Sequence, residues 1–251
     1  MNFTLEGCMS KIIKLYHGSE NIIEKPLFGK GKPYNDYGLG FYCTKDKDLA
    51  CEWAVSEDKS GYANEYEIDL TGLKILNLNK VQYPILTWLT VLIQNRTFDS
   101  YTQVQSSAKD YLIKSYNINY QDYDIIIGYR ADDSYFQFAK AFLNSAISYK
   151  TLTNSMLLGE LGNQYVVKSQ EAFSRINFLQ STEATADIWY QKKIEREEKA
   201  KGLYANSKLE QIKNNDILLG DIIRGRLNDN NKEILRQGIS SISSRSSRSD
   251  D

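Results

Sequence analysis

The feature that most constrains the fold is a short, uninterrupted run of β-branched residues, Ile125 to Ile127, closed by Gly128. Such a run, with no alternating polar residues, is typical of a strand that is buried on both faces. The segment Tyr66 to Leu70 instead alternates apolar and acidic residues, as a strand with one wet face does. Gly72 and a second apolar segment, Ile75 to Leu78, follow it, and this pattern predicts a β-hairpin.

The remaining patterns predict further short elements. Strands are expected at residues 11–16, 41–43, 164–167 and 176–179. Apolar residues at helical spacing, several of them preceded by capping residues, predict helices over residues 46–56, 83–94, 103–115, 136–143, 151–161 and 182–201. Between Glu20 and Tyr37 a long run of turn-forming residues excludes a helix or a central strand, and loops of this length are usually functional or mobile.

Composition limits the class of protein. The chain has 251 residues, 41% of them hydrophobic, and a formal net charge of -1, so it can bury a sizeable core and is not a strongly basic protein that coats nucleic acid or membranes. Three cysteines cannot all pair within the chain and their spacing fits no zinc motif. No signal segment is present, and the most apolar helical segment is about half as long as a membrane span. We therefore expect a cytoplasmic protein.

Three stretches carry the candidate chemistry. The first, Lys14-Leu15-Tyr16-His17-Gly18-Ser19, holds the only histidine of the chain at the end of an apolar run. A strand that ends in His-Gly presents an imidazole at a sheet edge, where a flat ligand can approach the backbone of glycine. The alternative is a surface-loop histidine beside a turn glycine. The second and third stretches are residues 37–44 and 162–167.

Together the three stretches resemble the motifs of the ADP-ribosyltransferase superfamily, in the His-Tyr-Glu branch that includes the PARP enzymes. Tyr16-His17-Gly18-Ser19 is similar to the first motif, and Gly40-Phe41-Tyr42 is similar to the second. Asn163-Gln164-Tyr165-Val166-Val167 resembles the strand that carries Asn-Glu-Tyr in those enzymes. The order of the motifs agrees, and the resemblance covers residues 11 to 180. It is closest to small bacterial members described as domains of unknown function.

The resemblance implies an α+β fold with an ADP-ribosyltransferase-like core. Two small, mostly antiparallel sheets are expected to pack face to face, with an NAD cleft between them, helices around them and a C-terminal helical extension. The predicted organisation is a flexible N-terminal arm (1–10), an ADP-ribosyltransferase-like domain (11–180), a charged helical extension (181–235) and a disordered Ser/Arg tail (236–251).

The resemblance also implies a role for each site residue, with NAD as a substrate and no metal. His17 is expected to hydrogen-bond a ribose hydroxyl of NAD, while the Gly18 backbone pairs with the nicotinamide carboxamide. Tyr42 is expected to stack on the nicotinamide ring. Ser19 and Thr44 are lesser candidates for polar contacts to NAD.

The third motif departs from the family pattern, because Gln164 stands where those enzymes have glutamate. A glutamine can hydrogen-bond a ribose, but it is neither a base nor a negative charge. This argues against elongation to poly-ADP-ribose more strongly than against mono-ADP-ribosyl transfer. Asp132, in the loop after the buried strand, is a substitute carboxylate that could face the NAD ribose or an acceptor, and Glu160 is another. Asp133 is expected only to cap the next helix.

The leading hypothesis is a mono-ADP-ribosyltransferase with His17, Tyr42 and Gln164 as its catalytic set. It would move ADP-ribose from NAD to a protein side chain or a nucleic-acid base and release nicotinamide. The alternatives are an NAD-binding or protein-interaction module with little or no catalysis, and an NAD glycohydrolase that uses water as the acceptor. Bacterial enzymes of this kind are often toxins or phage-defence effectors, so the resemblance also implies an antitoxin or inhibitor protein as a partner.

Overall fold

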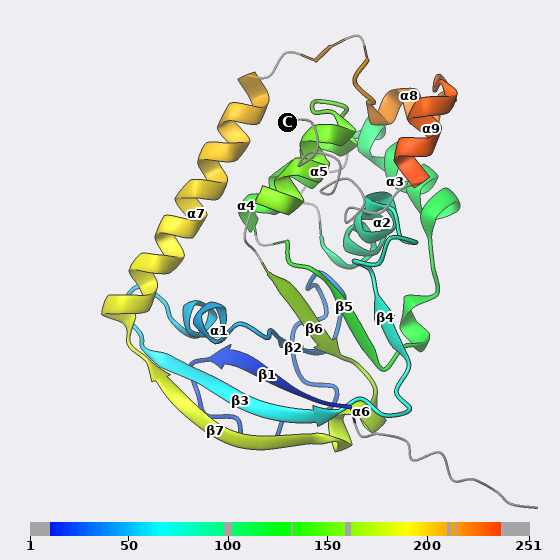
Figure 1. Ribbon diagram of the computed structural model, residues 1–251. Coiled ribbons are helices and arrows are strands. Elements are labelled where there is room, and N and C mark those ends of the chain that lie inside the picture. Colours follow the sequence, from blue (N-terminus) through cyan, green and yellow to red (C-terminus); the bar gives the residue numbers. More distant parts are fainter. Residues whose placement is uncertain are drawn as a thin grey trace, which may run out of the picture.

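The computed structural model describes residues 11–97, 102–131, 133–158, 162–209, 212–213 and 215–236. Its strands form two sheets (Figure 1). The first has the order β1-β3-β7, with bounds Ile12–Ser19, Gly61–Asp69 and Ile176–Ala184. The second has the order β2-β6-β5-β4, with bounds Phe41–Cys43, Asn163–Val167, Ile125–Tyr129 and Ile75–Asn77. Only β4 and β5 pair in parallel among these strands. The predicted α+β fold with two small, mostly antiparallel sheets is therefore confirmed.

The isoleucine run forms β5, which lies between β6 and β4 in the second sheet. Ile125 and Ile127 face the core between the two sheets, where Leu15 of β1 and Val167 of β6 also lie. Ile126 faces the other way, into the core beneath the helices. Both faces of the strand are covered, which explains why its sequence shows no polar alternation.

The predicted hairpin between residues 66 and 78 is wrong. Tyr66 lies in the central strand of the first sheet, whereas Ile75 begins β4, which pairs with Ile125 in the second sheet. The turn between them, where Asp69 accepts hydrogen bonds from the N–H and hydroxyl of Thr71, carries the chain from one sheet to the other. Local sequence marks the turn but does not choose the strand partner, which is distant in the chain.

Helices cover the outer face of the second sheet (Figure 1). The most apolar of them is α2, in which every residue from Ile85 to Ile93 is buried. The others on this side are α3 (Gln103–Tyr116), α4 (Asp133–Leu143) and α5 (Tyr149–Leu158), and α2 itself spans Ile85–Asn95. Among the described residues, no helix combines the length and the apolar character that crossing a bilayer requires.

The chain after residue 181 packs against the rest of the protein. β7 continues to Ala184, beyond the predicted end of that strand, and α7 (Ala186–Leu209) then runs along the side of the molecule (Figure 1). Arg196 of α7 donates to buried Glu52 of α1 (Lys47–Ala54) over 2.7 Å. Leu219 of α8 (Leu219–Ile223) and Leu235 of α9 (Asp229–Arg236) are buried in the helical core.

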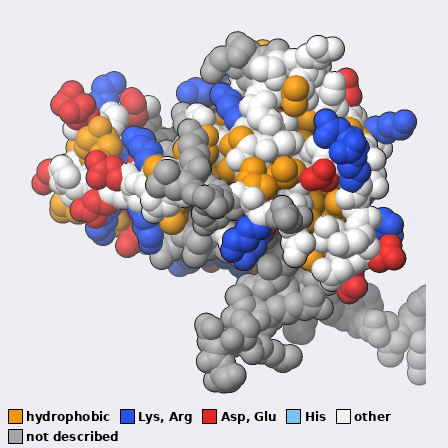
Figure 2. All heavy atoms as spheres, turned by 90° about the horizontal axis from the view of Figure 1, so that it is seen from above, with side chains coloured by type: hydrophobic (Ala, Val, Ile, Leu, Met, Phe, Trp, Pro, Cys, Tyr) orange, Lys and Arg blue, Asp and Glu red, His pale blue; other side chains and the backbone are white. Residues whose placement is uncertain are grey.

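Charges on the outer surface of this side are mixed. Seen from above, acidic and basic side chains intersperse where α7 lies, with no large area of one sign (Figure 2). The predicted arm, residues 1–10, lies outside the described residues, as does the predicted tail beyond Arg236.

Candidate functional site

A cleft of about 300 Å³ lies where the second sheet meets α1 and the loop before β2. Its walls come from segments that are far apart in the sequence, namely Asn35, Asp36, Tyr42, Trp53, Arg96, Arg130, Ala131 and Gln164. Tyr42 and Gln164, which the motifs place in the site, are therefore brought together. They are close because β2 and β6 are antiparallel neighbours, with Tyr42 opposite Val166.

Tyr42 is held in place by its hydroxyl. The hydroxyl donates to the carbonyl of Gly38 over 2.6 Å and accepts from the N–H of Tyr37 over 3.0 Å. Burial raises the pKa of Tyr42 well above its usual value, so the phenol stays neutral and can donate. Since the hydroxyl already bonds the loop, the ring is the part of Tyr42 that remains available to a ligand.

Two residues that line the cleft each have a buried polar atom without a hydrogen-bond partner within the described part of the chain. The two atoms are Oε1 of Gln164, an acceptor, and Nε1 of Trp53, a donor. Leaving a buried polar group unsatisfied costs about 1–3 kcal/mol. A ligand that offers both a hydroxyl donor and an acceptor would satisfy the two atoms.

The charged side chains of the cleft favour an anion. Buried Asp36 accepts from the N–H of Ala131 over 2.8 Å, and its other carboxylate oxygen lies 3.5 Å from Nε of Arg96. Arg130 lies 5.0 Å from the ring of Trp53. Among the described residues that line the cleft, two carry guanidinium groups and one carries a carboxylate, and guanidinium groups suit phosphate oxygens.

His17 holds the backbone of Tyr42. Its Nδ1 lies 2.7 Å from the Tyr42 carbonyl oxygen, and because a carbonyl can only accept, Nδ1 carries the proton. Burial lowers the pKa of His17 below its usual value, against the smaller opposing effect of this hydrogen bond. The neutral ring therefore keeps Nε2 as an acceptor. His17 is not among the residues that line the cleft.

Gly18, Ser19 and Thr44, for which the resemblance also implies contacts to NAD, lie outside the cleft as well. A Cβ on Gly18 would come within 1.9 Å of the Ala50 carbonyl oxygen, so close packing of α1 on β1 requires this glycine. The Ser19 hydroxyl accepts from the amide of buried Asn64 over 3.2 Å. Thr44 is buried, and its backbone bonds to β1. The structure gives these residues roles in holding β1, β2 and α1 together.

Sequence reasoning missed six of the residues that line the cleft, among them Asp36, Trp53, Arg96 and Arg130. Asp36 was counted among turn formers and Trp53 among the apolar residues of its helix. Arg130 had a usable signal, since it directly follows the buried strand whose end was expected to face a ligand. The neighbouring candidate, Asp132, lies outside the described residues, as does Glu160.

Within the described ranges, no cluster of three or more His, Cys, Asp or Glu side chains is arranged to hold a metal ion. The described cysteines, Cys43 and Cys51, are buried free thiols. Burial raises the pKa of the Cys43 thiol, which disfavours the thiolate needed for nucleophilic or metal chemistry.

The chain was compared with models of protein families. A family model described as "Protein of unknown function (DUF3990)" matches residues 13–178, which is more than half of the chain. The matched region begins in β1, ends in β7 and contains every segment that lines the cleft. No curated protein and no solved structure matches the chain.

Proposed function

We propose that this chain, which belongs to the DUF3990 family of proteins of unknown function, binds NAD in the cleft. The protein would then transfer ADP-ribose from NAD to a macromolecular acceptor. The observation that carries this proposal is the buried Oε1 of Gln164, which has no hydrogen-bond partner among the described residues and belongs to the same cleft as Tyr42. These are the two positions at which the sequence resembles the nicotinamide-stacking and ribose-binding residues of ADP-ribosyltransferases.

Each cleft residue would have a distinct task in holding NAD. The ring of Tyr42 would stack on nicotinamide. Oε1 of Gln164 would accept a hydrogen bond from a ribose hydroxyl, and Nε1 of Trp53 would donate to an acceptor atom of the dinucleotide. Arg130, with its guanidinium over the Trp53 ring, would pair with the pyrophosphate.

The transfer breaks the bond between nicotinamide and C1' of the ribose. The bonding electron pair leaves with nicotinamide, and the nucleophile of the acceptor forms the new bond to C1' and gives up its proton. Positive charge develops at the ribose, so the carbonyl dipole of Gln164, held in a buried site, would stabilise the transition state. Glutamine cannot take the proton of the acceptor, and lack of a general base lowers rates by about 10²- to 10⁴-fold.

A second candidate function is an NAD-binding module with little catalysis, and one observation favours it. Asp36 supplies the carboxylate among the described residues that line the cleft, and both of its oxygens are engaged, one by the Ala131 N–H and one by Arg96. That part of the site therefore offers no free base. A third candidate is NAD hydrolysis, in which water replaces the macromolecular acceptor.

Nicotinamide release from NAD by the full chain, with and without cell lysate, tests the proposal. Gln164→Ala should lower release, whereas Asn163→Ala, the matched control, should not, because the exposed Asn163 side chain bonds Asn79 rather than lining the cleft. If Gln164→Glu releases more nicotinamide than the wild type, the native site lacks a base. If it releases less, the amide of Gln164 is the working group.

The pattern of release separates the candidates. Release that needs lysate and Gln164 supports transfer, and release without lysate supports hydrolysis or self-modification. No release, together with a higher melting temperature in NAD, supports the binding module. Neither release nor binding would overturn the proposal. A toxin or phage-defence role with an antitoxin partner stays a prediction, which co-purification from the native host would test.

A further inference from the structure

The loop that joins β1 to β2 presents an unusual combination of exposed side chains. Residues 25–34, here named the basic loop, contain three exposed lysines and no acidic residue. The aromatic rings of Phe28 and Tyr34 are interspersed with these lysines, and both side chains are more than half exposed. The exposed lysines and large hydrophobic residues of the loop are Lys25, Leu27, Phe28, Lys30, Lys32 and Tyr34.

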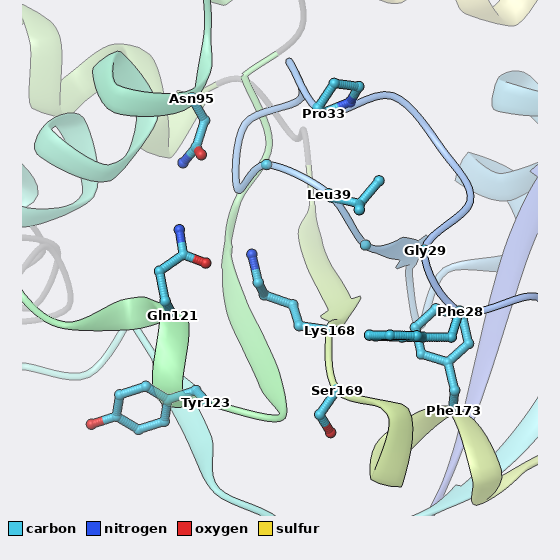
Figure 3. Close-up of a pocket in the computed structure, with 12 residues that line it drawn as sticks. Phe28, Gly29, Pro33, Leu39, Asn95, Gln121, Tyr123, Lys168, Ser169 and Phe173 are labelled. Atoms are coloured by element: carbon cyan, nitrogen blue, oxygen red, sulfur yellow. The ribbon is translucent and has the colours of Figure 1, made fainter.

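A second cavity, of about 380 Å³, lies beside the basic loop (Figure 3). The rings of Phe28 and of Phe173 in α6 (Gln170–Ser174) line it, with centroids 5.6 Å apart and planes at 80°. The Lys168 side chain extends between these rings and the amide of Gln121 (Figure 3). The cavity volume falls within the range of small-ligand sites, about 300–1,000 Å³.

Lys168 gives this cavity a positive charge. Its Nζ donates to the Tyr37 carbonyl over 2.8 Å and lies 5.7 Å from the ring of Tyr120. An ammonium group has three N–H donors, so two remain for a ligand. Burial lowers the pKa of Lys168 to about 8, and a bound anion would favour the charged form.

The cavity and the proposed NAD cleft share one loop. Asn35 and Asp36 line the cleft, whereas Gly38 and Leu39 line the cavity. The Tyr42 hydroxyl, which bonds the Gly38 carbonyl, fixes this loop from the cleft. A chain bound in the cavity would therefore lie next to the place where ADP-ribose is released.

We propose that the basic loop and this cavity bind a single-stranded nucleic acid, with a base stacked on Phe28 and backbone phosphates paired with Lys30 and Lys32. Exposed rings interspersed with cations are the general means of binding single strands, because every base has a face that can stack. A protein partner is less favoured, because the exposed apolar side chains of the loop lie among lysines, which all carry the same charge. The further step, that the bound strand accepts ADP-ribose, rests on the proposed function.

Binding is measured by fluorescence anisotropy with labelled oligothymidylate and oligouridylate of about 12 nucleotides, using the full chain without NAD. Both strands should bind, and Phe28→Ala should weaken binding by about 5- to 150-fold. The double variant Lys30→Gln/Lys32→Gln should reduce the slope of log affinity against log salt by about 1.4. The matched control, Lys150→Gln/Lys201→Gln, removes the same charge from exposed positions on α5 and α7 and should change neither.

Several results would overturn this inference. If neither single strand binds, the loop would instead be a protein-docking surface. If a duplex binds as tightly as the single strands, base stacking is excluded. Competition by a mononucleotide as effective as by the strand would make the cavity a free-nucleotide site. Because NAD is absent, these results do not depend on the proposed function. Incubation with NAD and mass spectrometry of the oligonucleotide then tests the acceptor step, and nicotinamide release without a modified strand would refute that step alone.

Discussion

Nδ1 of His17 donates a hydrogen bond to the backbone carbonyl oxygen of Tyr42 over 2.7 Å, so the first motif directly holds the second. The ring of His17 also packs 4.3 Å from the ring of Phe41, the residue before Tyr42. The hydrogen bond requires a proton on Nδ1. Burial lowers the pKa of His17, so Nε2 stays unprotonated and the imidazole is neutral. His17 therefore positions β2 whether or not its free Nε2 reaches a ligand.

This burial predicts that His17 makes the protein less stable in mild acid. Because the pKa of His17 is lower in the folded than in the unfolded protein, the unfolded chain binds the proton first as pH falls below 6.5. The free energy of unfolding should then decrease with falling pH, while the contribution of His17 is fully present above 6.5.

The variant His17→Gln tests this in thermal melts, because the chain has no other histidine. Its stability should change less than that of the wild type between about pH 7 and 5. Carboxylates whose pKa is lowered, such as Glu65 with its Lys14 hydrogen bond, act at lower pH and leave this window clear. Equal slopes in both proteins would contradict the prediction.

Gln164→Met should separate stability from ligand binding. Methionine has a similar shape but removes the buried acceptor that lacks a partner. We expect the NAD-free protein to keep its free energy of unfolding or gain up to about 1 kcal/mol. The stabilisation by added NAD should shrink, as measured by denaturant unfolding with and without NAD. A clear loss of stability in the NAD-free variant would show that Oε1 already has a favourable interaction in the folded protein.

Tyr42→Phe should loosen the loop that separates the cleft from the second cavity. It removes the hydroxyl that bonds Tyr37 and Gly38, and we expect a loss of about 1–3 kcal/mol. Tyr66→Phe is the matched control, since its hydroxyl bonds the Ile23 carbonyl at the other end of the same loop. Both variants should melt at lower temperature, but only Tyr42→Phe should reduce the NAD-induced rise in melting temperature. An equal reduction in both would assign the effect to the loop as a whole.

The strand pattern was predictable where a local signal decides it. The run Ile125–Ile127 indicated a buried strand, and it is one, because cores lie on both of its faces. The extent of β1 was not predictable, since residues 17–19 are held by pairing with Asn64, Ala63 and Tyr62 of β3. Strand pairing over such distances leaves no local mark, which is also why the hairpin prediction failed.

The candidate site was likewise predictable only where a local sequence motif marks it. Motif order identified Tyr42 and Gln164, and the structure brings both into one cleft. The same reasoning placed Gly18 there for ligand approach, but the space beside it is filled by the backbone of α1 at Ala50. Arg96 joins the cleft only because α2 ends beside the loop of Asp36, a contact set by tertiary packing.

Lys168 should be the most reactive lysine toward limiting amounts of an amine-selective acylating reagent. With its pKa lowered to about 8 by burial, a larger fraction of this amine is neutral near pH 8 than of an ordinary lysine, whose pKa is 10.5. Peptide mass spectrometry should find the label first at Lys168, and the preference should fade as the pH rises toward 10.5, where ordinary lysines become neutral as well. Lys168→Arg, which retains the charge, should remove that site without shifting label to Lys150. Uniform labelling would contradict the lowered pKa.

The contact between α1 and α7 decides whether the chain after residue 181 is a separate extension. Glu52 is buried and bonds Arg196, so Glu52→Ala should remove a charge-assisted hydrogen bond from a partly buried guanidinium and cost up to about 3 kcal/mol in denaturant unfolding. The control, Glu171→Ala, breaks the exposed pair with Arg175 and should cost no more than about 1 kcal/mol. Replacing both partners, as Glu52→Leu/Arg196→Met, should recover part of the loss, because both partly buried charges are then replaced by apolar side chains. If Glu52→Ala were as mild as the control, α7 would be a solvated helix that adds little to the fold. A large loss would make it a structural part of the domain, since the helix would then support the element that carries Trp53 into the cleft.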